Sequence, residues 1–243
     1  MSVEMAPMVK TVADVLERLA AIDRALPPGD GVKWFNKLYL EMTQQVAASA
    51  SASGQHRAAP GFLEELDVPF ARRYFEAFDA AGNSAKLPAG YPLHAWKPLF
   101  EARFATDIAP VQFALAGMNA HINHDLAIVI CDTCAARGTE PRDDGPEHKD
   151  YESVNGMIAE VEGKMKEWMM TGLLKDLDLA FGSVDDTVAV WDIGKARDAA
   201  WVRAEVIWSL RALPRLRDDY EAMNDRAVGF AGGALLTPVG LAG

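Results

Sequence analysis

One hydrophobic stretch of the chain carries a cluster of side chains that can move protons. In FALAGMNAHINHDLAIVICDTC, residues 113–134, the centre holds two amides, two imidazoles and a carboxylate: Asn119, Asn123, His121, His124 and Asp125. His121 and Asp125 are four residues apart, a spacing that lets the carboxylate accept a hydrogen bond from the imidazole on one face of a helix. Such a pair can titrate near neutral pH and serve as acid and base. We therefore predict that His121 and Asp125 are catalytic, and that the other three residues bind or orient a substrate.

A purely structural role for this cluster is the alternative. A buried His and Asp can satisfy each other and nearby backbone carbonyls, because each polar group left unpaired in a core costs a few kcal/mol. Five polar residues within seven positions of an otherwise apolar helix nevertheless favour a functional site. Gly117, one turn before His121, would leave room for a neighbouring helix or a ligand.

Two further segments could complete the site. In HKDYESVN, Asp150 is interpreted either as the N-cap of the next helix or as a substrate-binding residue placed with His148 over a pocket. In ARDAAWVRAEVIWSLR, Glu205 lies four residues after Trp201 and three before Trp208, so indoles would flank its carboxyl group. Apolar surroundings raise a carboxyl pKa, which makes Glu205 a candidate general acid, with both Trp side chains binding the substrate. A Trp stripe that belongs only to the core is the structural alternative.

No motif for a cofactor stands out, and none is expected. The alternative is a zinc or iron ion, which needs three or more ligands of the types present here: His121, His124, Asp125, His148 and His94. Neither H-E-x-x-H nor the paired E-x-x-H of di-iron bundles is present, and no Gly-rich phosphate loop or G-x-S-x-G motif occurs. Cys131 and Cys134 end a helix without the preceding strand of a redox pair, so they are interpreted as core thiols.

Composition excludes several classes of partner. The formal net charge is −11 and half of the residues are hydrophobic, which argues against nucleic acid, because phosphate contacts need clustered Lys and Arg. No uninterrupted apolar run reaches the ~18 residues of a membrane span, and the first residues do not resemble a secretory signal. A cytoplasmic protein that binds neither membrane nor nucleic acid is therefore predicted.

The spacing of apolar residues predicts helices nearly throughout. The polar cluster lies on a central helix, 109–137, which is apolar on all sides and ends at Gly138, so we expect it to be buried. Pro69 interrupts the segment 61–83, which is predicted to form two helices or one kinked helix. The fold is therefore predicted to be a single all-α domain, 1–243, of about seven to nine helices, with 139–150 as the candidate boundary.

Several motifs resemble those of a family of helical proteins of unknown function, found mainly in actinobacteria. They are spread over most of the chain: FARRYFEAFDA, AWKPLFEARF, PVQFALAGMNAHINHDLAIVI, HKDYESVNGMI and ARDAAWVRAEVIWSLR. The GMNAHINHDL stretch is the most specific of them. The resemblance implies a helical fold and draws attention to the same His and Asn residues, but it implies no activity.

The leading hypothesis is an enzyme that acts on a small hydrophobic molecule by cofactor-free acid–base chemistry. A buried carboxylate among aromatic walls suits cyclisation, isomerisation or elimination, in which charge develops on carbon and water must be excluded. A zinc- or iron-dependent hydrolase or oxygenase is the second hypothesis. The third is a non-catalytic protein that binds a lipid-like ligand, and the fourth is a bundle whose polar network only sets helix register.

Overall fold

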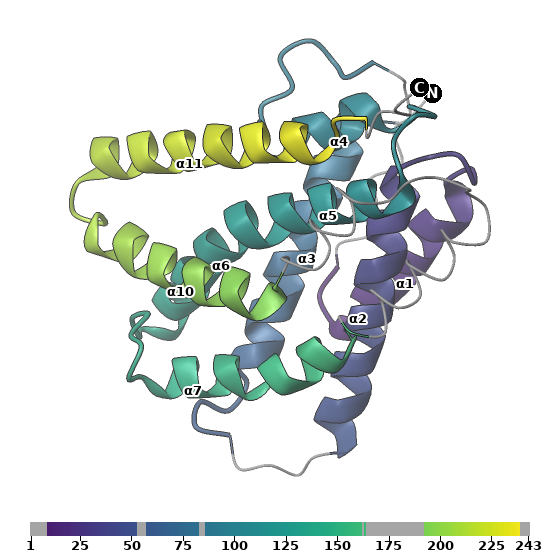
Figure 1. Ribbon diagram of the computed structural model, residues 1–243. Coiled ribbons are helices and arrows are strands. Elements are labelled where there is room, and N and C mark those ends of the chain that lie inside the picture. The colour runs from purple at the N-terminus through teal and green to yellow at the C-terminus, as the bar shows by residue number, and fades with distance from the viewer. Residues whose placement is uncertain (1–8, 53–56, 83–85, 162, 164–191, 239–243) are drawn as a thin grey trace.

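The secondary structure is entirely helical in the part of the chain that the computed structural model describes, residues 9–52, 57–82, 86–161, 163 and 192–238 (Figure 1). The predicted all-α class is therefore confirmed. The helical elements are α1 (Val12–Ala25), α2 (Val32–Ala52), α3 (Phe62–Ala81), α4 (Lys97–Ala102), α5 (Pro110–Ala120), the π-helical turn η1 (His121–Asp125), α6 (Leu126–Arg137), α7 (Pro146–Ser153), α10 (Ile193–Ser209) and α11 (Pro214–Leu235).

The segment α5–η1–α6 is one continuous helix at the centre of the fold, and it matches the predicted central helix. It begins with Pro110, whose missing N–H costs nothing at a helix start, and ends at Gly138, which adopts the left-handed conformation with φ 70°. Every residue from 111 to 120 is buried. Helices α2, α3, α10 and α11 pack around it, so most of its side chains meet protein rather than water, and only Asp132, Ala135 and Ala136 near its end are exposed.

A widened turn interrupts this helix at the polar cluster. Residues His121–Asp125 form a π-helical turn, closed by a hydrogen bond from the backbone N–H of Leu126 to the carbonyl of His121. A regular α-helical projection does not anticipate this turn, because it assumes 100° per residue throughout. Single π-helical turns inside α-helices occur frequently at functional sites.

Helix α3 runs through Pro69 as one helix, so of the two predicted alternatives, two helices or one kinked helix, the structure excludes the first. The Pro ring removes one helical hydrogen bond, to the carbonyl of Glu65, and this loss is local. Buried residues on both sides of the ring hold the helix against the core, among them Leu66, Val68, Ala71 and Tyr74. Tertiary packing therefore outweighs the local disruption.

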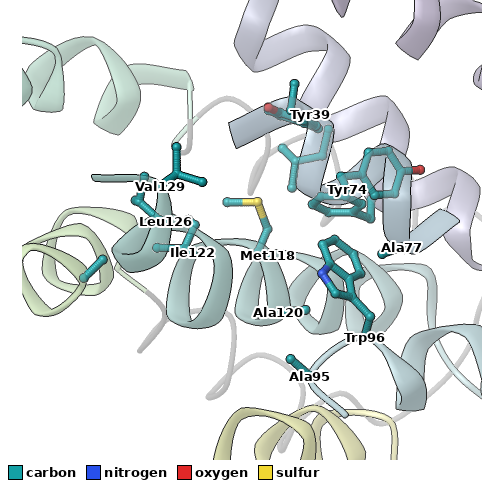
Figure 2. Close-up of a cluster of buried hydrophobic side chains, with 14 of the residues drawn as sticks. Tyr39, Tyr74, Ala77, Ala95, Trp96, Met118, Ala120, Ile122, Leu126 and Val129 are labelled. Carbon is teal, nitrogen blue, oxygen red and sulfur yellow. The ribbon is translucent and has the colours of Figure 1, made fainter. Parts of the chain in front are cut away.

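Aromatic side chains fill the space between the central helix and its neighbours. Figure 2 shows Tyr39, Tyr74 and Trp96 beside the helix that carries Met118 and Ile122. The Phe35 ring lies among them, with its centroid 4.9 Å from that of Tyr74 and 5.4 Å from that of Trp96. Phe35 also occupies the space beside Gly117, where the side chain of any larger residue would collide with the ring. A neighbouring helix, α2, therefore fills the room that this glycine was expected to leave.

A buried ion pair joins the start of α2 to the end of α4. Arg103 donates from Nε and Nη2 to the carboxylate of Asp30, with 2.5 Å between Nη2 and Oδ2. Both side chains are 1% exposed. A pair of this kind fixes two helix ends relative to each other, because either charge would be left unpaired in the core if they separated.

Helices on the two sides of the segment 139–150, the candidate boundary, contact each other, among them α6 and α10. Helix α7 begins after Gly145, so Asp150 lies inside it and is not the N-cap that the sequence suggested. The Asp150 carboxylate instead accepts from the backbone N–H groups of Ala58 and Ala59, which precede α3. Tyr151 donates to the carbonyl of Arg197 on α10.

The two cysteines belong to the core. Cys131 and Cys134 are buried and free on α6, and burial raises the pKa of their thiols to about 11 and about 12, respectively. Both thiols are therefore protonated at neutral pH. None of the helices in the described ranges is long and apolar enough to cross a membrane.

Candidate functional site

The carboxylate of Asp125 is the centre of a buried polar cluster. Its Oδ2 accepts a hydrogen bond from the indole Nε1 of Trp96 at 3.0 Å and lies 3.2 Å from Nδ1 of His121. Its Oδ1 lies 2.8 Å from Nδ1 of His124. His121 and Asp125 are each 2% exposed. The contact expected from their four-residue spacing is therefore present, and two more donors join it.

The surroundings of Asp125, His124 and His121 shift the pKa values of these three side chains in different directions. Burial opposes ionisation of Asp125, but hydrogen bonds from His121 and His124 outweigh it and lower the pKa of this carboxyl. Burial also opposes protonation of His124, yet the carboxylate outweighs it and raises the pKa of His124. For His121 burial dominates and lowers the pKa below its ordinary value. At neutral pH Asp125 is thus an anion and His121 a neutral imidazole.

His121 forms part of the wall of a cavity of about 160 Å³. Because its Nδ1 faces a carboxylate, Nδ1 carries the proton and Nε2 bears the lone pair. Nε2 is buried and has no hydrogen-bond partner within the described ranges. The imidazole stacks on the Phe70 ring, 3.6 Å away between centroids and 4° from parallel, while the edge of Tyr39 approaches at 4.7 Å.

The cavity wall is predominantly apolar. Its hydrophobic members come from helices on every side: Val12, Tyr39, Met42, Val46, Ala47, Leu63, Leu66, Phe70, Met118, Ile122, Leu126, Val154, Met157, Ile158 and Ile193. Figure 2 shows four of them, Tyr39, Met118, Ile122 and Leu126. The polar members besides His121 are Thr43, Arg57, Glu64, Asp67 and Arg197. A largely apolar ligand is the occupant that such a wall would accept.

Sequence reasoning predicted none of these polar groups besides His121, and two that it missed, Asp67 and the Tyr39 hydroxyl, carry protons in the wall. Asp67 lies on α3, one turn before Phe70, and receives no hydrogen bond from the part of the chain that is described. Burial, assisted by the charge of Glu64, raises the pKa of Asp67 to about 6. The hydroxyl of Tyr39 is buried without a partner in the same part, and burial keeps its pKa well above the ordinary value. The only local signal for Asp67 is a carboxylate among apolar neighbours in ELDVPF.

The two predicted asparagines lie outside the cavity wall and join helices to one another. Asn119 donates to the carbonyl of Val228 on α11 at 2.9 Å, and Asn123 donates to the side-chain oxygen of Asn119 at 3.1 Å. Arg203 on α10 donates to the side-chain oxygen of Asn123. Their observed contacts thus hold α10 and α11 against the central helix.

Of the predicted residues on α7 and α10, His148 and Trp201 contact each other, and none of the predicted residues on these two helices lines the cavity. The buried indole of Trp201 packs on His148, with ring centroids 4.6 Å apart. Trp208 donates to Glu140 near the surface. Glu205 is half-buried, and Asp150 holds the backbone before α3. The segments 148–155 and 201–208 are therefore neighbours of each other, while Arg203 is the α10 residue that reaches the polar cluster.

A row of polar contacts continues from His124 to the surface. Nε2 of His124 lies 3.7 Å from Oδ1 of Asp225, and Oδ2 of Asp225 lies 2.9 Å from Nδ1 of His94. The His94 side chain is 52% exposed. His94, considered above as a metal ligand, is thus connected to Asp125 only through Asp225 and His124. The row links the interior cluster to solvent by groups that can each carry a proton.

Several residues of these clusters were also candidate ligands for a zinc or iron ion. Across the described ranges, no three or more His, Cys, Asp or Glu side chains are grouped so that they could hold a metal ion. His121 and His124 both direct Nδ1 toward Asp125. His148, on α7, instead packs against Trp201 of α10. The zinc or iron hypothesis thus stays a prediction without geometric support.

Comparison with known protein families connects this site to a group of sequences. A model described as a family of unknown function, DUF5995, matches residues 12–238. Comparisons with curated proteins and with solved structures gave no match. The match spans nearly the whole chain, including the central helix with His121 and Asp125, and agrees with the resemblance seen in the sequence motifs. The chain belongs to the DUF5995 family of unknown function.

Proposed function

We propose that the protein is an enzyme that transfers a proton on a small, largely apolar molecule bound in the cavity, with His121 as the general base. One observation carries the proposal. The imidazole of His121, which lines an apolar cavity, bonds through Nδ1 to the Asp125 carboxylate, while its Nε2 is buried without a partner among the residues that the structure describes. A buried polar atom without a partner needs an explanation, and a ligand in the cavity would supply one.

The charges around His121 suit proton abstraction. Burial lowers its pKa, so the imidazole is neutral and able to accept a proton at pH 7. When Nε2 takes a proton, the positive charge that forms lies beside the Asp125 anion. That attraction is strong in a site shielded from water, so the carboxylate would stabilise the transition state as well as orient the ring.

Two further groups could handle the charge that the substrate develops. Asp67, with a pKa of about 6, is partly protonated near neutral pH and could return a proton. The Tyr39 hydroxyl stays protonated and could donate a hydrogen bond to a developing oxyanion. Titratable groups whose environments push their pKa values apart are typical of an acid and base pair. Isomerisation, elimination or cyclisation through a carbanion or enolate would use this arrangement.

The size of the cavity limits the reacting part of the substrate. Apolar cavities of about 150 Å³ bind benzene, so a cavity of about 160 Å³ would hold a group the size of a substituted aromatic ring. The charged side chains of Arg57, Glu64 and Arg197 also lie in the wall. A compact neutral or weakly polar group is therefore the expected occupant.

A generic carbon acid tests the proposal without knowledge of the natural substrate. We would use 1,2-benzisoxazole and its 5-nitro derivative, in which a base removes the C3 proton while the N–O bond breaks to give a cyanophenolate that absorbs light. The wild-type protein should exceed free imidazole of equal concentration by roughly 100-fold or more. The rate should rise with pH below about 6.5 and level off near pH 7, as the lowered His121 pKa requires.

Matched variants separate catalysis from binding. His121→Gln should abolish turnover with the fold retained by circular dichroism, while His148→Gln, which lies away from the cavity, should leave turnover unchanged. Wild-type turnover that is absent, or no faster than that of folded His121→Gln, contradicts the proposal. A thermal shift by both probes without turnover would favour the ligand-binding hypothesis. Stoichiometric zinc or iron in the purified protein, lost from His121→Gln, would favour the metal-dependent one.

A further inference from the structure

The outward face of α11 carries apolar side chains at a seven-residue repeat. Leu216, Met223 and Phe230 are seven residues apart and are 52%, 60% and 83% exposed, respectively. Residues three before or four after them are also mainly apolar. Together these residues form what we call the α11 seam: Leu213, Leu216, Tyr220, Met223, Ala227, Phe230 and Ala234. Single exposed apolar residues are common, but a continuous row along one helix is not.

The opposite face of α11 already anchors the helix to the protein. Val228, Gly229 and Gly232 are buried there, and a Cβ on Gly229 would collide with the backbone of His94. Asp225 accepts hydrogen bonds from the backbone N–H groups of His94 and Ala95. Figure 1 shows α11 at the edge of the fold, with α4 and α5 beside it. Apart from Tyr220, which is partly buried against the core, the seam residues are exposed in the part of the chain that the structure describes.

A heptad repeat of this kind indicates packing against another helix. Apolar positions spaced alternately three and four residues apart keep facing a partner helix when two helices wind slightly around each other. The repeat from Leu216 to Ala234 extends along nearly the whole of α11, which has 22 residues and a length of about 33 Å, and Leu213 continues it at the N-cap. A solvated helix face has no reason to follow this period.

Charges beside the seam favour a second copy of the same chain in antiparallel orientation. Asp219 and Arg226 are exposed, lie on the same flank of the seam, and form no ion pair within the described ranges. They are seven residues apart, on either side of Met223. If two copies of α11 cross antiparallel about a two-fold axis near Met223, each Asp219 comes next to Arg226 of the partner subunit. A parallel arrangement would bring Asn224 and Ala231 of the partner next to these charges and would pair neither of them.

We propose that the α11 seam is the interface of a two-fold symmetric homodimer, with the two helices antiparallel. A closed two-fold interface uses the same patch on both subunits, as the reciprocal Asp219 and Arg226 contacts require. One helix about 33 Å long and about 10 Å wide covers less than the roughly 800 Å² per partner of a standard interface. The dimer should therefore be reversible and dissociate at about micromolar concentration. This inference does not depend on the proposed enzymatic function.

Sedimentation velocity of the full chain over about 0.5–200 µM tests the proposal. The weight-average mass should rise from 26.4 kDa toward twice that value with concentration. Met223→Glu should remain a monomer throughout, because it places a charge at the centre of the seam. Phe104→Glu is the control, since Phe104 is an exposed apolar residue outside the seam and its substitution should leave association unchanged.

Charge exchange tests the orientation of the helices. Asp219→Arg alone and Arg226→Asp alone should each weaken association at least tenfold, because each places like charges together in the antiparallel pair. The double variant should restore association, since the opposite charges then face each other again. A wild-type monomer at every concentration, a dimer that survives Met223→Glu, or single-variant losses that the double variant does not repair would each overturn the proposal.

Discussion

Replacing Gly117 by Ala should destabilise the protein, although the same change stabilises most exposed helix positions. A Cβ at position 117 would lie 2.5 Å from Cδ2 and 2.6 Å from Cβ of Phe35, and closer still to Cγ. Real Cβ atoms do not approach other heavy atoms this closely, so the ring would have to move. Phe35 is fully buried, with the rings of Tyr74, Trp96 and His121 within 4.9 to 5.9 Å of it. These rings restrict how far the Phe35 ring can shift.

The magnitude follows from two opposing terms. Forcing an additional methyl group into a packed core costs about 1–3 kcal/mol. Replacing Gly by Ala inside a helix favours the folded state by about 0.5–1 kcal/mol, because the unfolded chain loses freedom and helix propensity improves. The expected net effect of Gly117→Ala is therefore a loss of about 1–2 kcal/mol in the free energy of unfolding.

Urea unfolding followed by far-ultraviolet circular dichroism measures this difference. The matched control is Gly233→Ala on α11, where a Cβ would meet nothing within 4 Å. Only the helix-propensity term acts there, so the control should be neutral or stabilised by up to about 1 kcal/mol. The two Gly→Ala changes should thus have opposite signs. If Gly117→Ala is as stable as the control, the close packing of Phe35 on the central helix is refuted.

Two further predictions concern buried charge. The folded-state pKa of Asp67, about 6, exceeds its ordinary value of 3.8, so protonation favours the folded state. The wild type therefore loses stability as pH rises through this range. Asp67→Asn removes that loss, so the free energy of unfolding of the variant relative to wild type should increase by up to roughly 3 kcal/mol between pH 3.5 and pH 7.5. A difference between the two proteins that does not change with pH would contradict the burial of Asp67. Asp30→Asn leaves Arg103 buried without its anion and should cost about 3–5 kcal/mol, whereas Glu101→Gln, which removes only the exposed pair with Lys97, should cost at most about 0.5 kcal/mol. Similar losses for the two variants in urea unfolding would show that the Arg103 pair is not buried.

The central helix and its first polar contact could be predicted from local sequence. Pro110 and Gly138 mark the two ends of a long apolar run, and a run that is apolar on all sides is expected to be buried. His121 and Asp125 are four residues apart on that run, so helix geometry alone brings them together. Both features depend on residues close in the chain, which is why they could be predicted without knowledge of the fold.

The remaining members of the site depend on how separate helices are placed. Trp96 reaches Asp125 across 29 residues, and Asp67 and Tyr39 come from α3 and α2. The spacing of Glu205 with Trp201 is helical, yet their helix turns Arg203 toward the polar cluster and leaves Glu205 away from the cavity. Periodicity shows which residues share a face of a helix, but not which face meets which partner.

Local sequence therefore determined the helical class, the buried central helix and the His121–Asp125 pair. The tertiary structure decided the composition of the cavity, the contact of Trp96 with Asp125, and the exposed face of α11. The physical reason is that the rotation and offset of each helix are set by the packing of side chains such as Phe35 against Gly117, and by buried pairs such as Arg103 with Asp30. Those contacts join residues that are distant in the chain, so no local pattern encodes them.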